Sequence, residues 1–83
     1  MAAEDKSGWQ REGEALVREL KFDDFAAAMA YVNRVADLAE EVDHHPDILV
    51  HGWNHVRLTL TTHSAGGLTD NDYAMARRID ELP

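Results

Sequence analysis

The sequence predicts an α+β fold, a four-stranded antiparallel sheet with two helices packed on one face. Three observations favour it. Alternating apolar and polar residues occur on both sides of the clearest helical stretch, and a second helical stretch follows the last of them. The predicted order is β-β-α-β-β-α. Because 83 residues hold one hydrophobic core, residues 1–83 are treated as a single domain in which residues 1–7 are expected to fray.

The first two strands are predicted to form a hairpin that turns at Gly13. A short strand over residues 9–12 precedes the turn. The longer strand after the turn alternates, and its apolar face consists of Leu16, Leu20 and Phe22. Arg18 falls on the same face and interrupts it.

The first helix is predicted to run from an N-cap at Asp23 to an end near Asp43. Its apolar residues recur at helical spacing, namely Phe25, Met29, Val32, Val35, Ala36 and Ala39. Pro46 disfavours helical geometry at the residue before it, so His44 and His45 are expected at or just past the C-terminus of the helix. The negative end of the helix dipole favours a protonated imidazole there.

Two further strands are predicted after Pro46. Residues 48–50 form the first, and a turn follows. The stretch 55–63 alternates cleanly, which puts His63 at the end of a strand on its polar face. Residues 64–67 are expected to form a flexible loop.

The last helix is predicted to start with a capping box. Thr69 is the expected N-cap and Asp72 its reciprocal partner, a role that accounts for Asp72 without any function. The apolar stripe of this helix consists of Met75, Ala76, Ile79 and Leu82.

Composition excludes several classes of function. Sixteen acidic against eight basic residues give a net charge of −8, and nucleic-acid-binding proteins need a basic surface, so direct DNA or RNA binding is not expected. The lack of cysteine removes disulfides, thiolate ligands and thiol nucleophiles. No apolar run reaches the roughly 18 residues of a membrane span, and no signal-peptide pattern is present, so we expect a cytoplasmic protein without membrane contact.

The five histidines are the feature that most suggests chemistry. Imidazole both gives and takes a proton near neutral pH. Taken singly, each histidine is most simply a solvated surface residue, and His51 and His55 keep that interpretation. A His-based metal site is a second alternative, although the adjacent His44 and His45 would point opposite ways in an extended chain.

Several of these residues recur at distinctive intervals. The pattern Glu40-x-x-x-His44-His45-Pro46 is followed by Trp53, His63 and Asp72, with six, nine and eight residues between them. The segment LTLTTHSAGGLT at 58–69 and the pairs Gly8-Trp9 and Phe22-x-Asp24-Phe25 complete the set. Together they resemble the pterin-4a-carbinolamine dehydratase family, from Gly8 to about Leu82.

The resemblance implies a hydro-lyase of the 4a-hydroxytetrahydrobiopterin dehydratase type. Such an enzyme converts a 4a-hydroxytetrahydropterin to the quinonoid dihydropterin and water, which recycles the cofactor of aromatic amino acid hydroxylases. His44 and His63 would be the acid–base pair, and His45 would orient the hydroxyl or assist. The implied pterin-contacting residues are Glu40, Asp43, Thr61, Thr62, Ser64 and Asp72. The pterin is the substrate, and neither metal nor cofactor is implied.

The surroundings of His44 add one expectation from the residues themselves. Glu40 lies one helical turn before His44, so its charge should favour the imidazolium form of that histidine.

The resemblance also implies a homodimer or homotetramer, with a hydroxylase as pathway partner. A sheet covered on one face favours self-association too, and Val50, Trp53 and Val56 are candidates for uncovered surface. An alternative of another class is a non-catalytic interaction, dimerisation or assembly module. The presence of all three histidines favours the enzyme.

Overall fold

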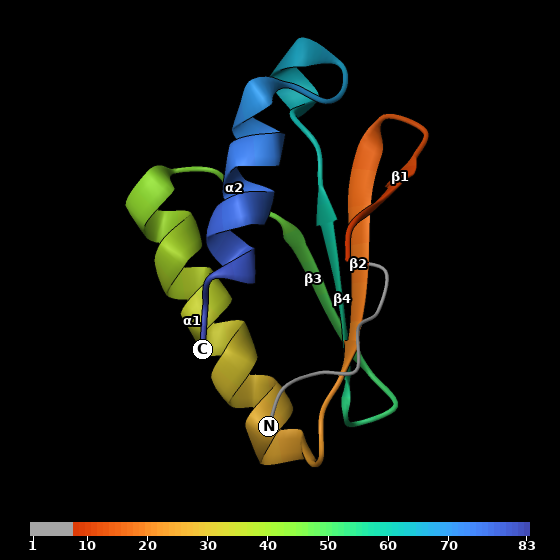
Figure 1. Ribbon diagram of the computed structural model, residues 1–83, viewed down its shortest axis with the longest axis vertical. Helices are drawn as coiled ribbons and strands as arrows, with labels where there is room; N and C mark the ends of the chain where they lie inside the picture. Colours follow the sequence, from red (N-terminus) through yellow and green to blue (C-terminus); the bar gives the residue numbers. More distant parts are fainter. Residues whose placement is uncertain (1–7) are drawn as a thin grey trace.

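The computed structural model describes residues 8–83, so the expected fraying of residues 1–7 lies outside the described residues. The predicted order of strands and helices is confirmed. The elements are β1 (Gln10–Glu12), β2 (Ala15–Lys21), α1 (Phe25–Val42), β3 (Asp47–His51), β4 (His55–Leu60), a 3-10 helix η1 (His63–Ala65) and α2 (Asp70–Asp80). The sheet order is β1-β2-β4-β3, with antiparallel pairs throughout. Both helices cover the same face of the sheet (Figure 1).

The core lies between that face and the two helices. Alternate residues of a strand point to one side, and the register pairs Leu16 with Leu60 and Leu20 with Val56. Val56, expected on uncovered surface, is 0% exposed. That expectation was wrong because the alternation of β4 directs Val56 beneath the helices, together with Leu58 and Leu60.

Arg18 also belongs to the helix-covered face, between Leu16 and Leu20. Its guanidinium forms an ion pair with Asp80 of α2. The same carboxylate accepts a hydrogen bond from Trp9 Nε1 at 2.9 Å. Arg18 is half-buried and Asp80 is exposed, and this ion pair joins the sheet to the end of α2.

The first helix begins one residue later than predicted. Asp24 and not Asp23 is the N-cap, since its Oδ1 accepts a hydrogen bond from Ala27 N at 2.8 Å. The buried residues of the helix are Ala28, Tyr31, Val35, Leu38 and Ala39. Phe25 was predicted in this stripe but is 54% exposed. The stripe that faces the sheet follows the spacing of Tyr31 and Val35, and Phe25 lies on another side of the helix.

The end of α1 agrees with the prediction. Asp43 adopts a left-handed conformation, with φ 55° and ψ 44°, and donates its N–H to Ala39 O. His44 N donates to the same carbonyl at 3.2 Å. This pairing is typical of a helix that stops at a left-handed residue, and it leaves His44 immediately beyond the helix.

His63 does not lie on a strand, because β4 ends at Leu60. Thr62 and Gly67 instead form a two-way backbone pair, with N–O distances of 3.1 and 3.2 Å. Within the loop that this pair closes, Ala65 N donates to Thr62 O and Gly66 N to His63 O, both at 3.0 Å. The predicted strand end and flexible loop are thus replaced by a hydrogen-bonded turn that contains η1.

Candidate active site

Asp72 is the buried centre of the site. The predicted start of α2 at a Thr69 N-cap is confirmed, and Thr69 N donates to Asp72 Oδ2 at 3.0 Å. Asp72 is 0% exposed. A buried carboxylate needs several hydrogen-bond donors to offset the loss of water, and one backbone N–H is not enough.

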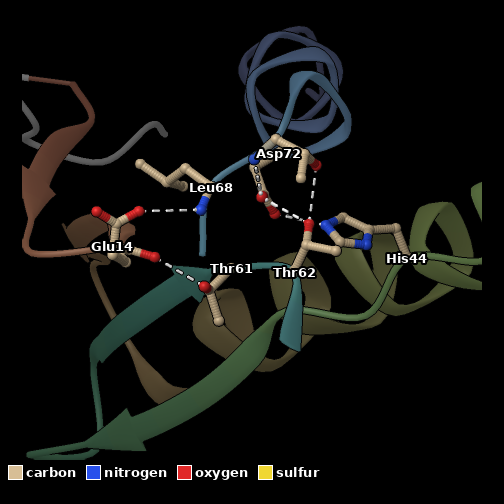
Figure 2. Close-up of polar contacts among 7 residues, drawn as sticks. Glu14, His44, Thr61, Thr62, Leu68 and Asp72 are labelled. Atoms are coloured by element: carbon tan, nitrogen blue, oxygen red, sulfur yellow. Dashed lines mark hydrogen bonds and ion pairs between the residues drawn. The ribbon is translucent and has the colours of Figure 1, made fainter. Parts of the chain in front are cut away.

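The other donors come from two distant segments of the chain. His44 Nε2 lies 2.6 Å from Asp72 Oδ1. Thr62 Oγ1 donates to Asp72 Oδ2 at 2.8 Å and lies 2.9 Å from Thr69 Oγ1. Figure 2 shows the imidazole and the threonine converging on the carboxylate from the end of α1 and from the segment after β4. The site thus joins three parts of the fold at one side chain.

These contacts decide the charge of Asp72. Burial raises the pKa of this carboxyl, and the hydrogen bonds from His44, Thr69 N and Thr62 lower it. The lowering outweighs the effect of burial, so the pKa of Asp72 lies below the usual value. An ionised carboxylate can only accept hydrogen bonds. The ionised carboxylate therefore accepts from His44 Nε2, and Nδ1 is the ring nitrogen that does not face Asp72.

His44 also borders a small pocket between the end of α1 and the first turns of α2. The pocket measures about 170 Å³, and its lining residues are Val42, Asp43, His44, Asn71, Ala74, Met75 and Arg78. Ligand pockets are typically about 300–1,000 Å³, so this recess encloses only part of a bicyclic ligand. A larger hollow of about 380 Å³ around Arg34, Glu41 and Arg78 includes none of the predicted site residues.

Glu40 and His45 form a separate pair. His45 Nε2 lies 2.7 Å from Glu40 Oε2, and both side chains are exposed. Glu40 thus contacts His45 and not His44, because the left-handed Asp43 breaks the helical spacing that would have stacked Glu40 and His44. The carboxylate that contacts His44 is that of Asp72 in α2.

The remaining predicted residues lie around this centre without a direct bond to Asp72. Thr61 Oγ1 donates to Glu14 O at 2.7 Å, so this hydroxyl points toward the β1–β2 turn (Figure 2). His63 and Ser64 are exposed in η1, next to Thr62 in the chain, and Asp43 lies at the pocket. The roles of these residues in pterin binding or catalysis stay predictions.

Sequence reasoning did not place the Thr69 hydroxyl or Asn71 in the site. The capping-box pattern indicated Thr69, but only as a cap. Nothing in the sequence indicated Asn71, because its position at the pocket depends on how α2 packs against the end of α1. In residues 8–83, no three His, Cys, Asp or Glu side chains come together as a metal site requires. In the same part of the chain, no helix is both long and apolar enough to cross a membrane.

Comparison with known proteins decides the family. The model of the family described as "Pterin 4 alpha carbinolamine dehydratase" matches residues 1–82. This chain belongs to that family. The resemblance noted in the sequence is therefore confirmed.

Curated relatives of the pterin-4a-carbinolamine dehydratase family are similar over most of their length. A protein of Thermomicrobium roseum is 59% identical, with 90% of this chain and 80% of that protein covered. One of Mycobacterium tuberculosis is 51% identical, with 98% and 85% covered. Both are named "Putative pterin-4-alpha-carbinolamine dehydratase".

Solved structures show the same fold. A transcriptional coactivator/pterin dehydratase from Brucella melitensis is 41% identical, with a TM-score of 0.80 over 89% of this chain and 80% of that one. A pterin dehydratase-like protein identified as a RuBisCO assembly factor in the alpha-carboxysome is 29% identical, with a TM-score of 0.68 over 87% and 82%. The predicted α+β fold is the fold of this family.

Proposed function

We propose that the protein dehydrates a 4a-hydroxytetrahydropterin to the quinonoid dihydropterin, as a step in tetrahydropterin recycling in the cytoplasm. Family membership supports the reaction class. The observation that carries the proposal is His44, whose ring is fixed by the buried Asp72 at the edge of a pocket. An orienting carboxylate of this kind is common in acid–base sites.

The proposed reaction needs two proton transfers and no change of oxidation state. The C4a hydroxyl leaves as water once it has taken a proton, and N5 loses its proton as the C4a–N5 double bond forms. His44 and His63 are the proposed pair, one protonated and one neutral at the start. Each turnover exchanges their protonation states, and proton exchange with solvent restores them.

The proposal assigns the remaining residues to substrate contact. His45 would orient the C4a hydroxyl. The residues proposed to contact the pterin through side-chain or backbone hydrogen bonds are Glu40, Asp43, Thr61, Thr62 and Ser64. Asp72 would contribute by holding the His44 ring in place. Because both protons move between imidazoles and substrate, the proposed reaction requires neither a metal nor a cofactor.

Replacement of the two histidines tests the proposal. In stopped-flow dehydration assays, His44→Ala and His63→Ala are each expected to lower kcat by about 10²–10⁴-fold, as for other lost general acid–base groups. KM should change much less, and the double variant should lose less than the product of the single losses because the pair acts as a unit.

His51→Ala and His55→Ala are the matched controls. These two rings stack on each other at 5.2 Å at the β3–β4 turn, and His51 pairs with Glu19. Circular dichroism should show that all variants are folded. If His44→Ala and His63→Ala turned over like the two controls, the catalytic assignment would be rejected.

Removal of metal is an independent test of the mechanism. Protein treated with a chelator is expected to retain its full rate. A lost rate that Zn²⁺ restores would support the His-based metal alternative instead.

A non-catalytic assembly role is the second candidate, and the similarity to the RuBisCO assembly factor favours it. The wild-type protein separates the two possibilities. If the folded protein fails to accelerate dehydration of the carbinolamine, the interaction module becomes the better assignment.

A further inference from the structure

The loop that carries His63 is held at its base from two opposite sides. The mutual pairing of Thr62 and Gly67 closes this loop. Four residues flank this closure. Thr61 and Thr62 lie where the chain enters the loop, and Leu68 and Thr69 lie where it leaves. Every one of these four residues bonds to an acidic residue elsewhere in the fold.

Asp72 binds Thr62 and Thr69. Its Oδ2 accepts from Thr62 Oγ1 at 2.8 Å and from Thr69 N at 3.0 Å. This contact fixes the loop to α2 and to His44.

Glu14 binds Thr61 and Leu68 from the β1–β2 turn. Its backbone carbonyl accepts from Thr61 Oγ1 at 2.7 Å, and its Oε1 accepts from Leu68 N at 3.4 Å. Figure 2 shows Glu14 on the side of the loop opposite His44. The two acids therefore divide the four positions between them.

The Glu14 side chain also lies directly against Gly67. A Cβ on Gly67 would overlap Glu14 Oε1 and lie 3.2 Å from Glu14 Cβ. Gly67 is not among the residues with a positive φ, so its backbone conformation does not require glycine. A larger side chain at position 67 would have to displace the Glu14 carboxylate.

Arg11 orients the Glu14 carboxylate. Arg11 Nη2 lies 3.2 Å from Glu14 Oε2, and Arg11 Nε donates to Gly13 O at 2.9 Å. Exposed ion pairs of this kind add little to stability, so we attribute to them an effect on geometry.

We propose that Glu14 is a positioning residue, which fixes the His63 loop from the β1–β2 turn and so sets where the His63 imidazole stands. The inference rests on the proposed function of His63. Small displacements of a reacting group can cost about 100-fold in rate, and without the Glu14 carboxylate the loop loses its contact at Leu68 N.

Replacement of Glu14 tests the proposal. Glu14→Ala is expected to lower kcat by about 10- to 100-fold, with KM and melting temperature close to wild type. Glu14→Gln should restore most of the rate, because an amide oxygen can still accept from Leu68 N. Glu12→Gln is the matched control, since Glu12 lies in the same hairpin and contacts Arg57 instead of the loop.

Thr61 gives a second pair of variants. Thr61→Val removes the hydroxyl that donates to the backbone carbonyl of Glu14 and should lower kcat, whereas Thr61→Ser keeps that hydroxyl and should recover most of the lost rate. An increase in KM with kcat unchanged would assign the Thr61 hydroxyl to pterin binding and count against positioning.

Amide hydrogen exchange separates this inference from the proposed function. Glu14→Ala should speed exchange at Leu68 and Gly67, and Glu12→Gln should not. Equal exchange in Glu14→Ala and wild type would reject the proposal whatever the activity. Faster exchange with normal kcat would reject it as well. A wild-type protein without dehydratase activity would overturn the proposed function, and with it the role of the loop.

Discussion

At the scale of single residues, Asp72 has two roles: it caps the start of α2 and it contacts His44. The sequence indicates only the first. Its Oδ2 completes the start of α2 by accepting from Thr69 N, while its Oδ1 faces His44. The first contact spans three residues and follows from a capping pattern. The second spans 28 residues, and no local pattern indicates it. The capping interpretation of Asp72 was therefore correct but incomplete.

Asp72→Asn is expected to lower both stability and turnover. An amide has one acceptor oxygen, so at least one of the donors His44, Thr62 and Thr69 N loses its partner. The cost is about 1–3 kcal/mol for an unsatisfied buried group, or about 4–8 °C of melting temperature per kcal/mol in a domain of this size. The rate should fall because the tautomer of His44 is no longer fixed. Normal turnover in a destabilised variant would leave Asp72 with the capping role alone.

The pH dependence of the stability lost in Asp72→Asn provides a control. The pKa of Asp72 is lowered in the folded protein, from its usual value of 3.8. Its contribution to stability is therefore fully present above that value and is lost as the pH falls through the lowered pKa. The melting-temperature difference between wild type and Asp72→Asn, followed by calorimetry, should be constant near neutral pH and shrink in acid. A difference that does not shrink would show that the ionised carboxylate is not its source.

At the scale of elements, the end of α1 places His44. The helix stops at Asp43 in a left-handed conformation, where the N–H groups of Asp43 and His44 share Ala39 O. Glycine adopts this conformation without strain, and Asp tolerates it better than most other residues. Position 43 is therefore a structural turn point as well as a predicted pterin contact.

Substitution at position 43 separates these two roles. Asp43→Gly is expected to keep or raise the melting temperature, whereas Asp43→Ala should cost about 1 kcal/mol because alanine is strained there. If the carboxylate binds pterin, both variants should raise KM alike. KM that rises in Asp43→Ala alone would indicate that only the helix end matters for binding.

Element order was predictable because alternation and helical spacing are strong local signals. The wrong predictions concern the exact residue at which a helix or strand begins or ends. Asp23 and Asp24 are chemically equal as caps, and only the observed bond to Ala27 selects Asp24. Likewise, the alternation continues to His63 in the sequence, but the pairing of Thr62 with Gly67 ends the strand pattern earlier. Within the site, the contact between His44 and Asp72 depends on tertiary packing, which local patterns do not encode.

At the scale of the whole molecule, the sheet has one covered and one open face (Figure 1). Leu49 is 53% and Trp53 61% exposed. Val50 and Val56 pair on the helix-covered side, so of the three residues expected at a contact surface only Trp53 remains well exposed. Large exposed apolar groups often mark interaction surfaces.

Self-association is therefore still expected, with Trp53 as the residue to test. Sedimentation at micromolar concentration should give at least a dimer of the 9.3 kDa chain. Trp53→Ala should weaken this association, and Phe25→Ala, which alters another exposed aromatic residue, is the control. A monomer at these concentrations would contradict the expectation.

The double use of Asp72 also has a consequence for how relatives of this protein diverge. A descendant that abandons the reaction still needs the start of α2, so selection for folding alone keeps an acid at position 72. His63 is exposed in its loop and is under no such restraint. His44 can give way to another side chain that donates to the carboxylate. Among divergent relatives, a retained Asp72 therefore says little about catalysis, and loss of His63 should be the earliest mark of a change of role.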